Sequence, residues 1–291
     1  MPFFRLDRFA TLYFFEPLQG IRLRTNRRIP ILMYHSISTA AEPGVHPYYQ
    51  TSTSPEVFEQ QMQFLHDHDY SVISLNDAAD LLGTGTRLKK SVVITFDDGY
   101  KDFYTHAFSV LECYGFPATV FLPTQYIRNT ALPFKGRDCL TWTEVRELRR
   151  SGIQFGSHTV SHPQLWGLNQ HDIERELRES KRTLEDNLGS EVRSFAYPFA
   201  FPEQDGRFAQ TLRGTLQTCR YEVGVSTILG SARSSNDRFF LPRLPINSCD
   251  DTALFRAKLA GAYDWLHLPQ YLRKLGKRLL AATLSVESSA A

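Results

Sequence analysis

The sequence predicts a single α/β barrel, a distorted (β/α) barrel with about seven parallel strands. Three observations support this prediction. Short apolar runs typical of buried strands alternate with segments of helical periodicity from residue 31 to residue 262. Six or seven such β-then-α units fit one barrel with right-handed crossovers better than two separate domains. No linker rich in Gly, Ser or Pro interrupts the middle of the chain.

The strands are predicted from apolar and β-branched runs. Residues 91–96 give the clearest signal, because Ser-Val-Val-Ile-Thr-Phe is continuous, as a strand buried on both faces requires. Further strands are expected, in chain order, at 31–34, 71–74, 118–122, 153–155, 192–197 and 221–225, with an extended segment at 238–246.

The helices are predicted from periodicity and end signals. Ser54 and Pro55 are an N-cap and a first-turn residue, and helical spacing follows them. Asn76 is expected to cap a second helix, which Gly83 ends. The remaining helices are expected at 103–111, 141–150, 173–188, 207–218 and 252–262, and residues 128–138 are expected to form a loop.

Composition excludes several classes of protein. The 291 residues include 33 Lys+Arg and 31 Asp+Glu, and this balance gives no electrostatic case for a nucleic-acid partner. The 21 Phe, 13 Tyr and 3 Trp supply too much apolar area for a disordered chain. The four cysteines lack the short spacing of a zinc knuckle or a redox pair, and we interpret them as idle thiols in a reducing compartment.

Three segments are expected along the chain: an N-terminal helical extension at 1–29, the barrel domain at 30–262, and a basic C-terminal helix with a flexible tail at 263–291. The last segment alternates Lys and Arg with Leu and Tyr, which is typical of a solvated helix. Disorder is expected from about residue 286.

The N-terminal segment is aromatic, and residues 9–15 are uncharged but far too short to span a bilayer. Arg5, Asp7 and Arg8 interrupt the apolar core that a signal peptide needs. The sequence therefore favours a cytoplasmic location. Peripheral contact with a membrane is an alternative, since the aromatic residues lie beside arginines.

Two adjacent carboxylates, Asp97 and Asp98, directly follow the predicted strand 91–96 in the motif Thr-Phe-Asp-Asp-Gly-Tyr. Burying charge at a strand end is costly without a partner, so a metal ion or a reaction would explain this pair. The alternative is a plain turn at Asp98-Gly99.

Two histidines, His158 and His162, follow the predicted strand 153–155. Four residues apart in a loop or single turn, both rings can reach one ion; solvated or core histidines are the alternative. The C-terminal ends of barrel strands meet on one face, where active sites lie. We therefore expect Asp98 to join the two histidines in a catalytic metal site with open coordination positions.

With these motifs the sequence resembles the polysaccharide deacetylases with a NodB-homology domain, carbohydrate esterase family 4. The matching segments are TFDDGY at 95–100, SHTVSH at 157–162 and SFAYPF at 194–199, and the resemblance covers roughly residues 30–248. It implies a NodB-like barrel with fewer than eight repeats. It also implies that Asp97 is the general base and that the metal is Zn²⁺ first, with Co²⁺, Ni²⁺, Mn²⁺ and Fe²⁺ as alternatives.

The resemblance also implies substrate-binding residues. The backbone N–H of Phe199 would donate to the oxyanion, and Pro198 and Tyr100 are assigned to substrate binding. The family usually has Tyr-Gly where this chain has Phe199-Ala200. That change keeps the backbone donor and alters the side-chain contacts with sugar.

The late histidine that usually acts as general acid is absent from residues 241–246. Instead His35 follows the strand 31–34, which resembles the permuted branch that includes exopolysaccharide deacetylases. This implies that His35 is the acid; a histidine that orients a neighbour is the alternative. Arg243 resembles an arginine that tethers the base and is assigned to the substrate site, with a surface ion pair as the alternative.

These assignments imply metal-assisted hydrolysis of N-acetyl groups on amino sugars of a polysaccharide or glycolipid precursor. Two other functions stay open. One is a metal-dependent amidohydrolase that opens a small cyclic amide, and the other is a non-catalytic carbohydrate-binding protein with a relic site. Acetate release from N-acetylhexosamine oligomers would favour the deacetylase over both.

Overall fold

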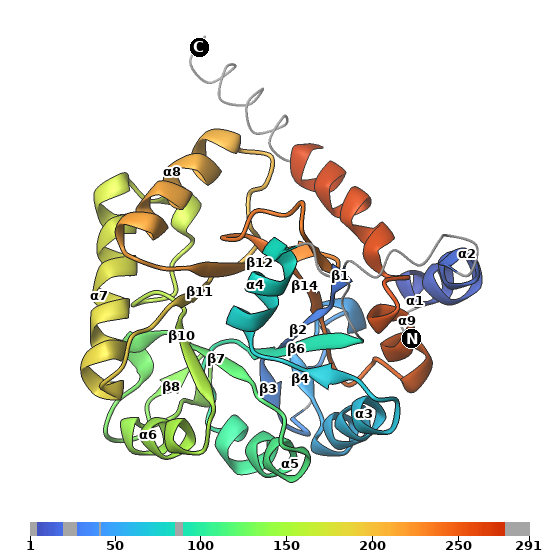
Figure 1. Cartoon of the computed structure of the whole chain (residues 1–291), viewed down its shortest axis with the longest axis horizontal. Coiled ribbons are helices and arrows are strands. Elements are labelled where there is room, and N and C mark those ends of the chain that lie inside the picture. The colour runs from blue at the N-terminus through green and yellow to red at the C-terminus, as the bar shows by residue number, and fades with distance from the viewer. Residues whose placement is uncertain (1–4, 20–27, 41, 85–89, 277–291) are drawn as a thin grey trace.

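A computed structural model describes residues 5–19, 28–40, 42–84 and 90–276 (Figure 1). Parallel strands close into a barrel, because β2 pairs with β14 on one side and with β6 on the other. This confirms the predicted fold. The ring consists, in spatial order, of β2 (Ile31–Tyr34), β14 (Leu241–Pro245), β12 (Val223–Leu229), β11 (Ser194–Ala196), β10 (Gln154–Ser157), β7 (Thr119–Leu122) and β6 (Ser91–Phe96).

Short strands decorate this ring. Two of them form a hairpin within residues 128–138, so the expectation of a plain loop there was wrong; strands of two residues are too short for alternation to reveal them. The short strands are β1 (Arg28–Ile29), which pairs with β13 (Ala232–Arg233), β3 (Ser36–Ile37), which pairs with β4 (Ser52–Thr53), β5 (Ser71–Val72), which pairs with β6, and the hairpin of β8 (Pro133–Phe134) and β9 (Arg137–Asp138).

Helices surround the barrel, and their ends follow capping chemistry. Ser54 accepts a hydrogen bond from the backbone of Val57, as predicted. The helix expected from Asn76 instead has Ser74 as its capping side chain and runs through Gly83. The helices are α3 (Pro55–Asp67), α4 (Leu75–Thr84), η3 (Phe103–Ala107), α5 (Phe108–Tyr114), α6 (Trp142–Arg150), α7 (Gln170–Leu188), α8 (Gly206–Thr218) and α9 (Thr252–Leu259).

Single turns of helix connect several of these elements. They are η2 (Pro47–Tyr49), η4 (Thr124–Tyr126), η5 (Leu165–Gly167) and η6 (Asp264–Leu266). A final helix over 267–276 follows η6.

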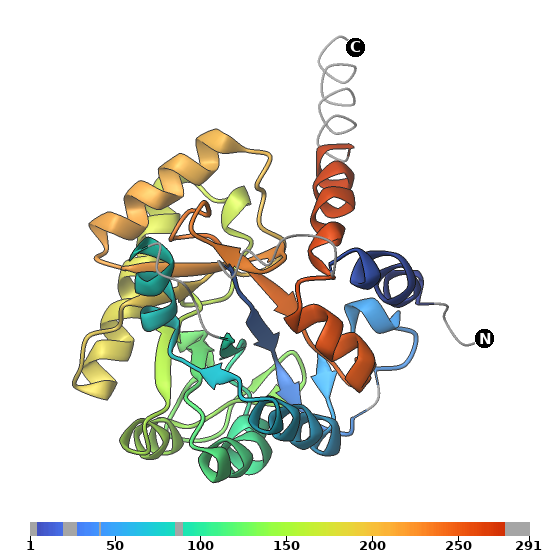
Figure 2. The same ribbon diagram turned by 45° about the vertical axis from the view of Figure 1, so that its right-hand side comes forward.

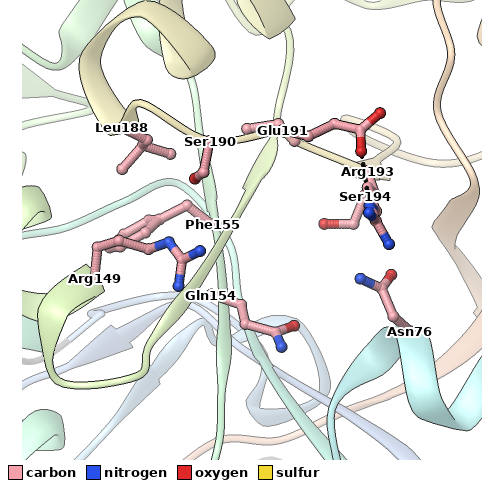
Figure 3. A pocket seen from close by; sticks show the side chains of 10 residues that line it. Asn76, Arg149, Gln154, Phe155, Leu188, Ser190, Glu191, Arg193 and Ser194 are labelled. Atoms are coloured by element: carbon pink, nitrogen blue, oxygen red, sulfur yellow. Dashed lines mark hydrogen bonds and ion pairs between the residues drawn. The ribbon is translucent and has the colours of Figure 1, made fainter.

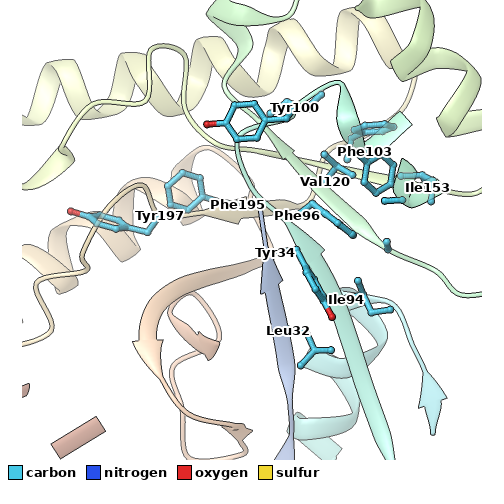
Figure 4. Close-up of a cluster of buried hydrophobic side chains, with 14 of the residues drawn as sticks. Leu32, Tyr34, Ile94, Phe96, Tyr100, Phe103, Val120, Ile153, Phe195 and Tyr197 are labelled. Atoms are coloured by element: carbon cyan, nitrogen blue, oxygen red, sulfur yellow. The ribbon is translucent and has the colours of Figure 1, made fainter. Parts of the chain in front are cut away.

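Alternate strand residues belong to two separate cores. One set packs against α3, η3 and α5, and Figure 4 shows part of it: Leu32, Tyr34, Ile94 and Phe96. The other set includes Ile31 and Val93 and is joined by the buried face of α4. Because these residues lie near the beginnings of the strands, α4 covers that end of the barrel. The opposite end, where the strands finish, is left for the site.

The described parts of both terminal segments pack on the barrel, and the N-terminal part is helical. This helix consists of α1 (Leu6–Ala10), η1 (Thr11–Phe15) and α2 (Glu16–Gln19), and the Phe15 ring stacks on Trp265 at 4.6 Å. The tail expected to be disordered from residue 286 lies outside the described residues. Among the described residues, no helix is both long and apolar enough to cross a membrane.

Candidate active site

The predicted ligands meet at the C-terminal end of the barrel. His162 Nε2 lies 3.2 Å from Asp98 Oδ1, and His158 Nε2 lies 3.6 Å from the same oxygen. One ligand atom from each of the three residues falls within 4.8 Å of the others, and all three residues are buried. The structure therefore brings Asp98 together with two histidines that lie 60 and 64 residues further along the chain, as the barrel topology predicts.

Each ligand is oriented by a neighbour. His158 Nδ1 lies 2.8 Å from the carbonyl oxygen of Ala196, at the end of β11, so a proton on that nitrogen leaves the Nε2 lone pair facing Asp98. Tyr100 donates its hydroxyl hydrogen to Asp98 Oδ2 at 3.0 Å. The structure thus places the hydroxyl of Tyr100, a residue that the sequence assigned to substrate binding, on the carboxylate of Asp98, a predicted metal ligand.

The donor set fits a divalent metal ion. Asp98 Oδ1 is buried and accepts no hydrogen bond from any described residue. Burial lowers the pKa of His158 to about 4, so its imidazole is neutral and able to ligate. Burial alone would raise the pKa of Asp98, but its contact with His162 and the charges of nearby groups, Lys135 among them, hold that pKa well below its usual range. One carboxylate and two imidazoles around one position are a common ligand set for zinc and related ions.

The second carboxylate, Asp97, has a different partner. The Arg243 guanidinium binds it with two hydrogen bonds of 2.7 Å and is itself fully buried. Burial would raise the pKa of Asp97, but Arg243 keeps it below its usual value, so the carboxylate stays ionised. The alternative of a surface ion pair does not hold for Arg243. Arg243 therefore holds the Asp97 carboxylate in place from within the barrel.

His35 lies on the other side of Asp97. Its Nε2 is 4.0 Å from Asp97 Oδ2, and about a fifth of its side chain is exposed. Register explains this position, since Tyr34 of β2 pairs with Phe96 of β6 and the next residues of both strands are His35 and Asp97. Burial lowers the pKa of His35, although the two nearby carboxylates oppose that shift.

The mouth of the site is aromatic and carries one cation. The Phe199 side chain is 49% exposed, and its ring lies 4.7 Å from that of His162, whereas Pro198 is buried. Lys135, in the hairpin turn, reaches Asp98 Oδ2 at 3.3 Å and lies over the rings of Phe134 and Phe199. Lys135 was missed because residues 128–138 read as a loop without a visible link to the motif.

A buried carboxylate holds the loop that carries both histidines, residues 158–163, here called the histidine loop. Glu176 of α7 accepts hydrogen bonds from the backbone N–H groups of Val160 and Ser161 at 2.8 and 2.9 Å, and from the Ser161 hydroxyl. In the sequence Glu176 is one of many charges on an amphipathic helix, so nothing there distinguishes it from a solvated residue.

Backbone strain is concentrated here. Seven described non-glycine residues have positive φ, and five of them belong to this site: Asp98, Lys135, Thr159, His162 and Phe199. Such conformations persist only where the surroundings impose them, and they are frequent at functional sites. Gly99 also has positive φ, and a Cβ there would lie 2.6 Å from Leu122, so the motif needs glycine at this position.

Two hollows of about 270 Å³ lie elsewhere on the described surface. The first is shown in Figure 3, where Arg149, Gln154 and the Glu191–Arg193 ion pair surround it. Gln154 begins β10, so this hollow is at the opposite end of the barrel from the metal ligands. The second lies between α3 and the start of α9. Neither is lined by a metal ligand or by Asp97.

Known proteins resemble this chain over two thirds or more of its length. The Bacillus subtilis protein YxkH is 29% identical over 78% of this chain and 74% of its own. Poly-β-1,6-N-acetyl-D-glucosamine N-deacetylase of Staphylococcus aureus strain MSSA476 is 27% identical over 67% of this chain and 68% of its own.

Solved structures share the fold. The Streptococcus pyogenes deacetylase PplD, solved in complex with acetate, superposes with a TM-score of 0.69, at 28% identity over 81% of this chain and 99% of that chain. IcaB from Ammonifex degensii superposes with a TM-score of 0.66, at 22% identity over 80% of this chain and 97% of that chain. A family model described as polysaccharide deacetylase matches residues 84–215, the segment that holds all three motifs. In sequence and in fold, the chain is therefore similar to polysaccharide deacetylases.

Proposed function

We propose that this protein is a metal-dependent deacetylase that hydrolyses N-acetyl groups from the amino sugars of a polysaccharide or its precursor. The main observation behind this proposal is that two adjacent carboxylates have different partners. Asp98 faces two imidazoles and can ligate a metal, whereas Asp97 is tethered by Arg243 and is left outside the ligand set. A metal site with a separate, fixed base beside it suits hydrolysis of an amide.

The reaction breaks the carbon–nitrogen bond of the acetamido group. When bound, a divalent metal would polarise the acetyl carbonyl and lower the pKa of a water molecule towards about 7. Asp97 accepts the proton of the attacking water, and the oxygen of that water forms a bond to the carbonyl carbon. The amine nitrogen leaves with a proton. Acetate and a free amino sugar are the products.

Two further groups have roles in this proposal. The backbone N–H of Phe199 donates to the oxyanion, an interaction worth about 3–4 kcal/mol in other enzymes. His35 donates the proton to the leaving amine. Asp97 and Asp98 favour the protonated ring that this role needs, while burial opposes it. We assign Tyr100 and Arg243 to positioning, because each holds one carboxylate.

The substrate class follows from the family and from the aromatic mouth. The Staphylococcus aureus relative is named for poly-β-1,6-N-acetyl-D-glucosamine, so we propose a glycan or glycolipid precursor that contains N-acetylhexosamine. The exposed ring of Phe199 offers an apolar face on which a sugar ring can pack. For the metal we propose Zn²⁺, with Co²⁺, Ni²⁺, Mn²⁺ and Fe²⁺ as the other ions that this ligand set accepts.

The central test combines metal content with acetate release from N-acetylglucosamine oligomers. Asp98→Asn and His158→Ala should lose both together. Asp97→Asn should keep its metal and lose roughly 10²–10⁴-fold in rate. Asp138→Asn, on the exposed face of the hairpin, is the matched control and should change neither. Full metal content and turnover in either ligand variant would refute the site assignment.

The role of His35 and the alternative functions are tested in the same assay. His35→Gln should slow release most from substrates with poor leaving amines; an equal loss on all substrates would assign His35 to orientation. Ring opening of small cyclic imides without acetate release would favour the amidohydrolase. Tight glycan binding with no release in any of the five metals would favour the relic site.

A further inference from the structure

The N-terminal helix carries its apolar face outward. Leu6, Phe9, Tyr13, Phe14 and Leu18 follow the spacing i, i+3, i+7, i+8, i+12, which aligns them in one stripe along the helix. Their side chains are 62, 41, 65, 58 and 52% exposed, and the Phe9 ring contacts those of Tyr13 and Phe14 at 5.0 and 5.9 Å. We call these five residues the aromatic stripe.

The face turned toward the barrel is largely polar, apart from Phe15, which stacks on Trp265. Asp7 and Thr11 are buried; Asp7 accepts hydrogen bonds from Arg5 and from the Tyr263 hydroxyl, and Thr11 accepts one from Trp265. A surface helix of a globular protein normally buries its apolar residues and exposes its polar ones. Because these contacts hold the helix in place, the side chains of Tyr13, Phe14 and Leu18, which are more than half exposed, can meet another surface.

The helix lies at the periphery, near the catalytic end of the barrel. Figures 1 and 2 both show α1 and α2 at the edge of the molecule, beside α9. Arg5 donates to the carbonyl oxygen of Cys249 in the loop that follows β14, the strand that supplies Arg243. The start of the N-terminal helix is therefore joined to the end of the barrel at which the strands finish.

The chemistry of the stripe favours a lipid surface over a protein. Phe, Tyr and Leu on one face of a short helix are typical of segments that lie in the membrane interface. The distribution of charge also favours an anionic lipid surface. Residues 1–29 and 263–291 together hold ten Lys or Arg and four Asp or Glu, whereas residues 30–262 hold 23 Lys or Arg and 27 Asp or Glu. Five side chains on one helix are also far fewer than the roughly 20–30 residues per partner in a stable dimer.

We propose that the aromatic stripe docks the protein on an anionic lipid surface, with the stripe in the headgroup region and the barrel outside it. This interaction goes beyond the proposed function and does not depend on it. It presents the site to glycans that are held at a membrane. It needs no membrane-spanning segment, because interfacial helices bind through one apolar face.

Co-sedimentation with vesicles tests the proposal. The full chain should sediment with vesicles of phosphatidylcholine and phosphatidylglycerol, and less with phosphatidylcholine alone. The triple variant Tyr13→Ser, Phe14→Ser, Leu18→Ser should reduce the bound fraction by roughly tenfold or more, since three apolar side chains no longer enter the interface. Leu132→Ser replaces an exposed leucine outside the stripe and should bind as the parent does.

Controls keep the outcome clear. The triple variant should retain the parent's circular dichroism and its acetate release from soluble oligomers, because no stripe residue belongs to the site. Equal vesicle binding by parent and triple variant would overturn the proposal, as would a parent that binds neither vesicle. Light scattering adds one more refuting result: a concentration-dependent dimer that the triple variant abolishes would identify a second copy as the partner.

Discussion

Arg243→Met tests how Asp97 is kept in place. Arg243 is fully buried and uses its guanidinium on Asp97, on the Thr95 hydroxyl at 3.2 Å and on the Ser226 carbonyl at 3.0 Å. Methionine has a similar length and no charge. The substitution therefore removes the partner of Asp97 while keeping most of the packing volume.

The expected loss of stability is large, because the variant leaves the buried Asp97 carboxylate without a positive partner. Removing one member of a buried ion pair typically destabilises a protein by about 3–5 kcal/mol. A domain has a total stability of about 5–15 kcal/mol, so this variant is expected to be marginal at 37 °C. Replacing both partners is different: with Asp97→Asn in the same chain no ionised group is buried alone, and roughly half or more of the loss should be recovered.

Urea unfolding of the parent, both single variants and the double variant gives the coupling free energy. We expect at least about 1.5 kcal/mol, within the range for residues in direct contact. Arg238→Met is the matched control, because its ion pair with Asp80 is exposed and should contribute less than about 1 kcal/mol. Strictly additive effects, or a cost for Arg243→Met no greater than for Arg238→Met, would show that the buried pair is not what stabilises this site.

Three further substitutions test other contacts. Glu176→Ala should weaken metal binding by roughly tenfold or more and lower the free energy of unfolding by about 2 kcal/mol, because the backbone of the histidine loop loses its hydrogen-bond acceptor. Metal titration measures the first effect and urea unfolding the second. An unchanged metal affinity would contradict this prediction. Asp7→Asn should lower stability at neutral pH, and this cost should shrink as the pH falls below 3.8. Burial would raise the pKa of Asp7, yet Arg5 holds it below 3.8, so the contribution of the carboxylate is lost as the pH falls through that lowered pKa. Lys135→Met should tighten metal binding about fivefold. The Lys135 ammonium lies 3.3 Å from Asp98 and should repel a bound metal ion by roughly 1 kcal/mol. Weaker metal binding in this variant would mean that Lys135 positions the Asp98 carboxylate.

The barrel and its catalytic end followed from local patterns. The run at 91–96 is continuous and β-branched, and its end is the end of β6. Once the strands are taken as parallel, residues that follow them must gather at one end, which is how Asp98 and the histidine loop were placed together. Alternation adds more: 93, 95 and 97 share one side of β6, so Asp97 faces the barrel interior with Arg243.

The sequence pattern did not predict the order of the strands around the barrel or which charged side chains become buried. That β2 lies between β14 and β6 makes His35 and Asp97 neighbours, and no local signal encodes this order. Glu176 and Lys135 were missed for a related reason: a charge on a helix and a charge in a hairpin turn acquire their roles only from the loop and the carboxylate that fold against them. The contact of Tyr100 has the same origin: its assignment to substrate binding came from the motif, and only the folded structure shows that its hydroxyl donates to Asp98.

The adjacent pair Asp97-Asp98 shows why these missing contacts matter chemically. Two carboxylates at neighbouring positions would repel each other and compete for one proton if both faced the same space. Asp97 ends the regular alternation of β6 and binds a buried guanidinium, whereas Asp98 adopts positive φ and turns toward two imidazoles. Separate partners allow both groups to stay ionised within one motif. The strained backbone at Asp98 therefore turns two consecutive carboxylates toward different partners, as the proposed base and the proposed metal ligand require.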